Sequence, residues 1–386
     1  MSTTTTKTLV LGGGVGGIVI ATELRKMLPR QHSVVLIERE IDHRFAPSYL
    51  WLMTNNRTTK QISRPMKAVT KHGVELIHGV VEKISPDSRT VVVDGTPHIA
   101  DYVVVALGAE YCPQNVPGLA EAGINLYTME GAAAIRDALR SIQKGRVVVL
   151  VSSMPFKCPA APYEAAMLAE SLLKHNGVRH AVDVEIYTPE PGPMAVTGPQ
   201  VSDQVRGLVE GKGIRYFPQY SVKLVDLSQK LIHFANDKTV PFDVLIYVPP
   251  HRAPAVVRES GLTGESGWIP VDRSTLKTRF EGVYAIGDVT GIVLSNGKPL
   301  PKAGMFAHAQ ASVVAKNIAQ EITGTGSTVT FDGHGACFLE VGNGRAGIGQ
   351  GNFYAEPAPA VKLKQPSVLW HYGKVLYEKY WLFKWF

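Results

Sequence analysis

The chain has 386 residues, 45% of them hydrophobic and 19% charged, which is typical of a soluble globular protein large enough for two or three domains. Its net charge of +7 is compatible with a polyanionic cofactor or an anionic membrane surface, whereas the lack of lysine and arginine runs with interleaved aromatics argues against nucleic-acid binding. Three widely spaced cysteines exclude a disulfide framework, and no pair has the close spacing of a zinc site, so we expect no bound metal.

Residues 7–40 are predicted to form a strand, a glycine-rich turn, a helix and a second strand. Gly12, Gly14 and Gly17 lie where the first strand meets the helix, and Glu38 ends the second strand. In this pattern the glycines let a pyrophosphate approach the helix N-terminus, and the carboxylate accepts a hydrogen bond from a ribose hydroxyl. The segment therefore predicts a Rossmann-type dinucleotide site but does not distinguish NAD from FAD.

A second nucleotide-fold unit follows a proline- and glycine-rich crossing at residues 112–118. It begins with the strand RVVVLVSS, continues through a helix to the strand DVEIYT, and ends near residue 250. Where a nicotinamide-binding unit would carry glycines after its first strand, this chain has the sequence SSMPFKC at residues 152–158. Side chains and prolines there would block a pyrophosphate, so we expect no nicotinamide nucleotide to bind.

Cys158 takes the place of that phosphate loop, at the expected start of a helix. A helix N-terminus lowers the pKa of a thiol, so we expect Cys158 to be a reactive thiolate. Glu164 follows six residues later and is a candidate proton acceptor for the same site. The alternative is that Cys158 is a small buried hydrophobic residue, as most free cysteines are.

The stretch TRFEGVYAIGDVTG, which contains Gly287 and Asp288, resembles the second flavin-binding signature of the two-dinucleotide-binding-domain flavoproteins. In that signature an aspartate at a strand end hydrogen-bonds the ribitol chain. The sequence VVVALGAE at residues 103–110, with Gly108, resembles the connector of the same superfamily. This resemblance implies FAD as the cofactor.

Cys337 lies beyond the flavin signature, in HGACFLEVGNGRAG, where the chain can fold back over the flavin. Two thiols beside a flavin can attack a sulfur substrate, form a persulfide and pass two electrons to the ring. As for Cys158, the alternative is a structural buried thiol.

The C-terminal tail is predicted to be an amphipathic helix. An apolar stripe recurs at helical spacing, with Lys374 and Glu378 elsewhere on the helix and Trp381 and Trp385 nearby. The stripe consists of Leu369, Tyr372, Leu376, Tyr380 and Phe383. Such a helix can lie in a membrane interface, dock on the core of its own protein, or form a dimer contact.

Over nearly its full length the chain resembles the sulfide:quinone oxidoreductases and the related flavoprotein subunit of flavocytochrome c sulfide dehydrogenase. The resemblance rests on LGGGVGGI, FAPSYLW, CPAAPYE, AIGDVTG, LPKAGMFAHAQA and ACFLEVGNG. It implies that Cys158 and Cys337 flank the flavin and carry a sulfur bridge and that Glu164 handles protons. It also implies that Lys302 lies near the flavin pyrimidine, where a cation would stabilise the anionic reduced ring.

Many members of that family carry a third cysteine closer to the second one, whereas Cys112 lies 46 residues before Cys158, so no catalytic role is assigned to it. Family members are monotopic and take quinone from the bilayer, which favours the membrane role for the tail. The quinone is then expected on the flavin face opposite the sulfide, among aromatic side chains. The candidates are Phe338 first, and then Trp370, Tyr372 and Tyr377.

The predicted activity is FAD-dependent oxidation of sulfide to polysulfide or zero-valent sulfur, with two electrons passing to a membrane quinone. Type II NADH:quinone oxidoreductase, the flavocytochrome c flavoprotein and a flavin-bearing redox-sensing scaffold are the alternatives. We expect peripheral attachment at the cytoplasmic face of a membrane, and homo-oligomers are left open. The expected division is an FAD-binding domain (1–110 and 256–330), a second Rossmann-like domain (111–255) and a C-terminal region (331–386).

Overall fold

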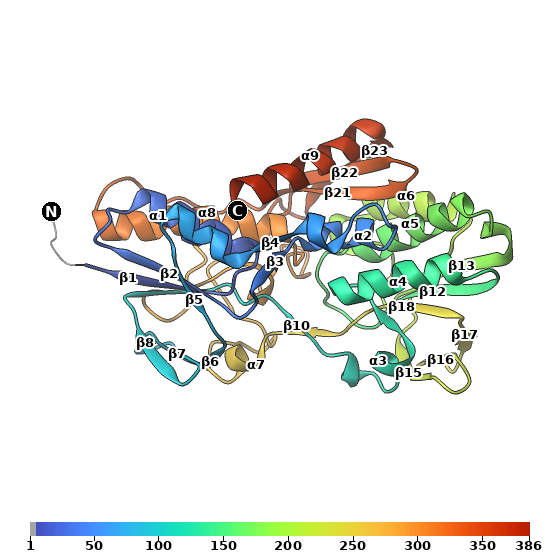
Figure 1. The fold of residues 1–386 in the computed structure, drawn as a ribbon, viewed down its shortest axis with the longest axis horizontal. Coiled ribbons are helices and arrows are strands. Elements are labelled where there is room, and N and C mark those ends of the chain that lie inside the picture. Colours follow the sequence, from blue (N-terminus) through green and yellow to red (C-terminus); the bar gives the residue numbers. More distant parts are fainter. Residues whose placement is uncertain (1–4) are drawn as a thin grey trace.

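The computed structural model describes residues 5–386 (Figure 1). Its first unit is built on a parallel sheet in the order β20-β9-β1-β2-β5. These strands are β1 (Lys7–Leu11), β2 (Ser33–Glu38), β5 (Glu75–His78), β9 (Tyr102–Val105) and β20 (Val283–Ala285). Helices α1 (Val15–Met27) and α8 (Gly304–Thr323) pack against each other beside the sheet. Because β20 and α8 come from the second half of the chain, this unit is assembled from two separate segments.

The second unit contains a parallel sheet in the order β11-β18-β12-β13-β14. Its strands are β11 (Ile124–Asn125), β12 (Gly145–Val151), β13 (Val182–Tyr187), β14 (Arg215–Phe217) and β18 (Val244–Val248), and its helices are α4 (Met129–Ser141), α5 (Ala161–His175) and α6 (Pro199–Glu210). Strand β12 is buried over its last five residues, which explains its unbroken apolar run. Its carboxyl end leads into the SSMPFKC loop and then into α5.

An antiparallel pair of short strands, β10 (Glu110–Tyr111) and β19 (His251–Arg252), carries the chain between the two units. Small antiparallel sheets and short helices complete them. The additional elements are β3 (Asp42–Arg44), β4 (Ser63–Pro65), β6 (Val81–Ser85), β7 (Thr90–Val93), β8 (Thr96–Ile99), β15 (Val222–Asp226), β16 (Leu231–Phe234), β17 (Thr239–Pro241), α2 (Tyr49–Leu52), α3 (Leu119–Ala122) and α7 (Ala255–Arg258).

The C-terminal region spans both units along one side of the molecule (Figure 1). Strands β21 (His334–Gly342), β22 (Arg345–Asn352) and β23 (Ala360–Ser367) form an antiparallel sheet, and helix α9 (Val368–Lys384) packs over it. Strand β21 also contacts α5 of the second unit. Among residues 5–386, no helix is long and apolar enough to cross a membrane.

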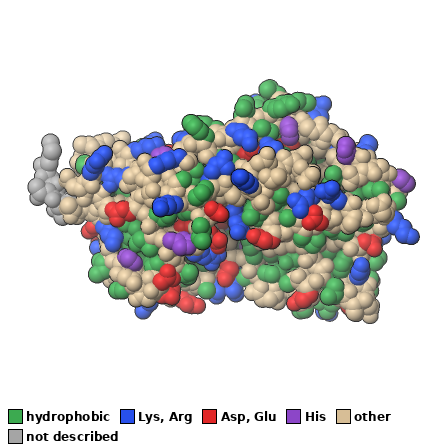
Figure 2. All heavy atoms as spheres, in the orientation of Figure 1, with side chains coloured by type: hydrophobic (Ala, Val, Ile, Leu, Met, Phe, Trp, Pro, Cys, Tyr) green, Lys and Arg blue, Asp and Glu red, His purple; other side chains and the backbone are tan. Residues whose placement is uncertain are grey.

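Helix α9 presents its apolar stripe outward and two of its charged residues, Lys374 and Glu378, inward. Exposed side chains along it are Leu369, Tyr372, Leu376, Tyr380 and Phe383, the last with 85% of its surface accessible. Figure 2 shows hydrophobic side chains gathered on the crest where α9 begins. Lys374 and Glu378, in contrast, are buried, and Trp381 and Trp385 are packed in the core. The two tryptophans therefore anchor α9 to its own protein and are not on the face that a membrane could contact.

Candidate redox site and cofactor cradle

The glycine-rich turn after β1 is shaped as a dinucleotide cradle. A Cβ atom on Gly17 would lie 1.7 Å from the carbonyl oxygen of Gly12, so the helix can approach the strand this closely only with glycine at this position. A Cβ on Gly14 would meet no atom within 4 Å, which leaves open space above the turn. Glu38 lies beside the turn and accepts a hydrogen bond from the backbone N–H of Gly13. These features fit the pyrophosphate and ribose of a dinucleotide.

The flavin-like signature lies at the end of β20, next to this cradle. The Oδ1 atom of Asp288 is buried and has no hydrogen-bond partner among the described residues. An orphaned acceptor of this kind fits a polyol hydroxyl, because a buried polar atom without a partner is costly. Gly287 adopts a left-handed backbone (φ 74°), and its N–H donates to Gln310 at 2.7 Å. Gly108 also has a positive φ, 68°, just after β9.

Lys302 is buried and does not lie on the solvated surface. Its ammonium donates to the carbonyl oxygens of Asp288, at 2.7 Å, and Thr290, at 3.0 Å, and lies 3.4 Å from the ring centroid of Trp268. Burial lowers the pKa of Lys302 to about 8, and the charge of Asp288 opposes this shift. A cation is thus held beside the flavin-like signature, while its position relative to the flavin pyrimidine remains a prediction.

Cys158 is held in a strained backbone conformation next to that lysine. Its φ of 49° is in the left-handed region that favours glycine. Its N–H donates to the carbonyl oxygen of Lys302 at 2.6 Å, and the hydroxyl of Tyr127 donates to the carbonyl oxygen of Lys157 at 2.6 Å. The loop that replaces a phosphate-binding turn is therefore attached directly to the segment carrying Lys302.

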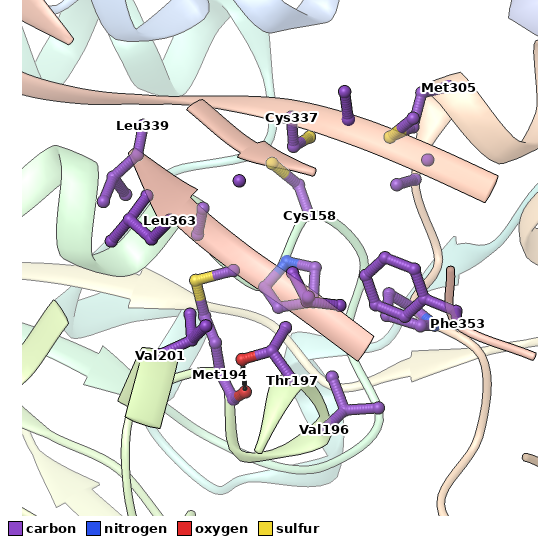
Figure 3. A pocket seen from close by; sticks show the side chains of 18 of the residues that line it. Cys158, Met194, Val196, Thr197, Val201, Met305, Cys337, Leu339, Phe353 and Leu363 are labelled. Atoms are coloured by element: carbon purple, nitrogen blue, oxygen red, sulfur yellow. Dashed lines mark hydrogen bonds between the residues drawn. The ribbon is translucent and has the colours of Figure 1, made fainter. Parts of the chain in front are cut away.

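Cys158 and Cys337 line the same cavity, although 179 positions separate them in the sequence. In Figure 3 their sulfur atoms point toward one another, with Cys337 carried by β21. The cavity has an empty volume of about 650 Å³, including its open mouth. Its wall is almost entirely apolar and includes Met194, Val201, Met305, Leu339, Phe353 and Leu363. Both thiols are free and only partly accessible.

The expectation of a thiolate at Cys158 is wrong. Helix α5 begins only at Ala161, and burial raises the pKa of Cys158 well above its usual range, with the charge of Glu164 adding to the shift. Burial likewise raises the pKa of Cys337 to about 11, reinforced by Glu164 and opposed by Lys374. Desolvation in an apolar cavity outweighs the partial charge of a helix end. Both cysteines therefore rest as thiols, and a nearby base must take their protons.

Glu164 is suited to that task. It lies in the first turn of α5 with only 2% of its surface exposed, and its Oε1 atom accepts hydrogen bonds from the backbone N–H of Glu340, at 2.8 Å, and from the ammonium of Lys374, at 3.3 Å. Burial raises the pKa of this carboxyl group, and Lys374 opposes the shift. For Lys374, burial lowers the pKa, but the charges of Glu164 and Glu340 outweigh it and raise the pKa on balance.

The sequence pattern indicated no role in the site for Lys374 or Glu340. Both are charged residues within apolar stretches, CFLEVG for Glu340 and YGKVLY for Lys374. A charged side chain on a buried face needs a partner of opposite charge. The placement of Lys374 and Glu340 within apolar stretches could therefore have indicated that they lie together. The sequence did not show which elements would bring them together.

The aromatic candidates for a quinone site lie under or along α9. A Cβ on Gly373 of α9 would be 3.5 Å from the ring of Phe338, so this ring lies beneath the helix. Tyr377 is 6.3 Å from Phe45 between ring centroids, and burial raises its pKa to about 12, with Cys337 adding to the shift. Trp370 is half-buried and Tyr372 is 60% exposed at the start of α9. Phe338 adjoins Cys337 in β21 and Tyr377 is affected by its charge, so these two are the candidates with a direct relation to Cys337.

Cys112 is completely buried, and its N–H donates to Pro250 at 2.8 Å in the crossing between the two units. It does not line the cavity that contains Cys158 and Cys337.

Comparison with known proteins places the whole chain in a group of redox enzymes. It is 27% identical to the sulfide-quinone reductase of Aquifex aeolicus, over 97% of this chain and 90% of that protein. It is 24% identical to the mitochondrial sulfide:quinone oxidoreductase of Mus musculus, over 90% of this chain and 78% of that protein. The crystal structure of the Aquifex aeolicus sulfide:quinone oxidoreductase superposes with a TM-score of 0.89 at 26% identity, covering 98% of this chain and 91% of that one. Residues 6–313 match the family of pyridine nucleotide-disulphide oxidoreductases. The chain therefore belongs to the pyridine nucleotide-disulphide oxidoreductase family.

Proposed function

We propose that this protein uses FAD to oxidise sulfide to protein-held zero-valent sulfur and transfers the two electrons to a quinone. The family implies a flavin cofactor, and the cradle around Gly14, Glu38 and Asp288 has the space and the unpaired acceptor that a flavin dinucleotide would use. When bound, the flavin supplies a two-electron acceptor between the sulfur substrate and the quinone.

One observation carries the proposal: Cys158 and Cys337 face one another in an apolar cavity, and Cys158 stands in the loop where a nicotinamide phosphate would bind. Two thiols in this arrangement can hold sulfur between them. An apolar wall suits uncharged sulfur better than it suits a nucleotide, because a phosphate would lose its hydration without gaining hydrogen-bond donors.

The sulfur chemistry balances with these two cysteines. The two free thiols would first be joined in a disulfide by losing two protons and two electrons, the electrons passing through the flavin to quinone. Hydrosulfide then attacks this disulfide between Cys158 and Cys337, which forms a persulfide on one cysteine and releases the other as a thiolate. The thiolate then bonds to the terminal sulfur of the persulfide, giving a trisulfide bridge, one proton and two electrons. Glu164 takes the proton from the persulfide, and the electron pair leaves toward the flavin. Repeating the cycle lengthens the sulfur chain by one atom for each quinone reduced.

The outward apolar face of α9 is proposed to attach the protein peripherally to the membrane that supplies the quinone. Leu369, Leu376 and Phe383 are at least 68% exposed on this face, and the exposed Lys379 is on the same helix. An apolar stripe with nearby lysines is typical of helices that lie in a membrane interface. Phe338, which lies beneath α9 beside Cys337, and Tyr377 of α9 are the side chains we propose to contact the quinone ring.

Comparing sulfide with NADH as the reductant of the flavin distinguishes the proposed function from the main alternative, type II NADH:quinone oxidoreductase. We expect anaerobic sulfide to bleach the oxidised flavin rapidly, and NADH at the same concentration to do so at least about a hundredfold more slowly, because the loop at residues 152–158 offers a nucleotide no cradle. Stopped-flow absorbance of the flavin band measures both rates. Rapid bleaching by NADH together with none by sulfide would contradict the proposal.

A further inference from the structure

We propose that Glu340 and His371 form the exit route by which protons released at the cysteine pair reach the surface beside α9. The inference rests on the proposed function, which releases protons inside an apolar cavity whose wall offers them almost no polar acceptor. Glu340 and His371 have no part in the sulfur chemistry proposed above. The inference gives them a role in carrying away its protons.

Four titratable side chains are linked in sequence by their contacts, beginning with Glu164 and Lys374, whose charges act on both cysteines. Glu164 and Lys374 are 3.3 Å apart, and the ammonium of Lys374 is 4.0 Å from Oε1 of Glu340. Both carboxylate oxygens of Glu340 contact Nδ1 of His371, at 3.1 and 3.0 Å. The first and last of these contacts are hydrogen bonds, and the middle one, between Lys374 and Glu340, is an ion pair that the lysine must shorten to transfer a proton.

The last member of this line is the one that solvent reaches, as an exit requires. The side chains of Glu164 and Glu340 are 3% and 1% exposed, that of Lys374 is 9% exposed, and that of His371 is 23% exposed. Thus the first three members are shielded from solvent and the imidazole reaches it. Histidine is well suited to the last position, because it can take a proton on one ring nitrogen and release one from the other.

The surroundings of His371 contain few competing charges. Its ring lies 5.8 Å from Trp51 of α2, edge to face, and 5.7 Å from the neighbouring Tyr372. Four charged groups lie around the His371 ring: Glu340 of β21, Glu164 of α5, Lys374 of α9 and Arg57. The guanidinium of Arg57 stacks on Trp51 at 4.6 Å and pairs with the carboxylate of Glu378. Arg57 is thus already neutralised, and Glu340 is the carboxylate left to exchange protons with the imidazole.

The transfer leaves no net change in the charges of the route. Glu164 receives the proton of the persulfide S–H and passes it to Lys374, which gives one of its own protons to Glu340. Glu340 passes that proton to His371, and the ring releases a proton to water. One proton leaves for each sulfur atom added, and each group returns to its starting state.

Proton release during a single turnover tests this route. Sulfide is mixed anaerobically with the holoenzyme in weakly buffered solution, and a pH-indicator dye is followed together with flavin absorbance. We expect both signals to share one rate in the unmodified protein. In Glu340→Gln and His371→Gln, which keep side-chain size and a hydrogen bond, proton release should slow at least about tenfold.

His334→Gln is the matched control, because His334 has the same contact to a carboxylate, Asp332 at 2.9 Å, but is 63% exposed at a strand end and does not itself line the cavity. It should release protons at the unmodified rate. Free imidazole should restore fast release to His371→Ala but not to Glu340→Gln. Equal rates in all variants, with the unmodified flavin bleached by sulfide, would overturn the inference. Lack of bleaching in the unmodified protein would instead overturn the proposed function.

A measurement without turnover covers the case in which a variant binds flavin poorly. The infrared S–H band of the reduced thiols is replaced by an S–D band after transfer to D₂O, at a rate set by proton exchange with solvent. In a Cys112→Ala background we expect His371→Gln to slow this exchange and His334→Gln to leave it unchanged. If His371→Gln exchanged at the unmodified rate, the cluster would be merely structural.

Discussion

At the scale of single residues, the site keeps its thiols protonated and places a base beside them. Glu164 raises the pKa of both thiols, whereas Lys374 lowers it. The two cysteines are therefore sensitive to the balance of these two charges. A thiol that ionises only when a substrate arrives is protected from unwanted alkylation and oxidation.

Replacing Glu164 by Gln should make the thiols more reactive. The change removes a negative charge, so the pKa of Cys337 should fall from about 11 and alkylation by iodoacetamide at pH 9 should become about tenfold faster. Lys374→Met should have the opposite effect. Peptide mass spectrometry measures each cysteine separately, and Cys112 is the internal control. Slower alkylation of Cys337 in Glu164→Gln would contradict this electrostatic account.

Glu190 makes the stability of the protein depend on pH. It is buried, accepts a hydrogen bond from Tyr163 at 2.6 Å, and precedes Met194 in the loop that lines the cavity. Burial raises its pKa from 4.5 to about 7. A raised pKa means that the folded state binds the proton of Glu190 more tightly than the unfolded state does. The resulting contribution to the free energy of unfolding is complete below pH 4.5 and is lost as the pH rises through 7.

We therefore expect Glu190→Gln to stabilise the protein at pH 8, by at most about 3 kcal/mol, and to have little effect at pH 4.5. The midpoint of urea unfolding at the two pH values measures this difference. Glu210→Gln is the control, since Glu210 is exposed and paired with Arg206. A stabilisation that is equal at both pH values would show that the charge of Glu190 is not its cause.

At the scale of elements, α9 has two different faces. Trp381 and Trp385 pack beneath it, and Glu378 accepts from Ser48 at 2.5 Å and pairs with Arg57 at 3.0 Å. These contacts fix the helix to the protein, so the apolar stripe on its other side is presented rigidly. The helix therefore combines two of the roles that the sequence left open, docking on its own core and offering an apolar surface.

Substituting the stripe should release the protein from membranes without affecting the redox site. We expect Leu369→Gln combined with Leu376→Gln to weaken binding to anionic phospholipid vesicles about tenfold or more, because each substitution removes an exposed apolar side chain that would be buried in the lipid. Vesicle flotation measures binding. Leu227→Gln, at a leucine that is 52% exposed on the other unit, is the control and should bind normally. Equal vesicle binding by the unmodified protein, the double leucine variant and Leu227→Gln would contradict the membrane role of α9.

The sequence predicted much of this architecture because some elements have local signatures. The turn at Gly12 and the strand end at Asp288 each require a particular residue at a particular spacing, so both could be recognised. The cluster of Glu164, Glu340 and Lys374 could not, because it joins three elements, α5, β21 and α9, that are distant in sequence. The pKa of Cys158 was wrongly predicted for a related reason: burial in a cavity formed by distant segments dominates it, and the helix nearby in sequence has the smaller effect.

At the scale of the whole molecule, the two nucleotide-fold units have different roles. The first keeps the cradle of a dinucleotide, with Glu38 and Asp288 beside open space and an unpaired acceptor. The second keeps the sheet but carries Cys158 in place of a phosphate loop, and β21 brings Cys337 to the same cavity. The C-terminal region joins the two units and adds the surface proposed to contact the membrane.

The most direct test of this account is an anaerobic titration of the flavin with sulfide in the unmodified protein and in three cysteine variants. We predict that sulfide bleaches the flavin in the unmodified protein and in Cys112→Ala, and that bleaching is lost in Cys158→Ser and in Cys337→Ser, because neither can hold sulfur between two thiols. Undiminished bleaching in both serine variants would contradict the central claim that the facing cysteines carry the sulfur.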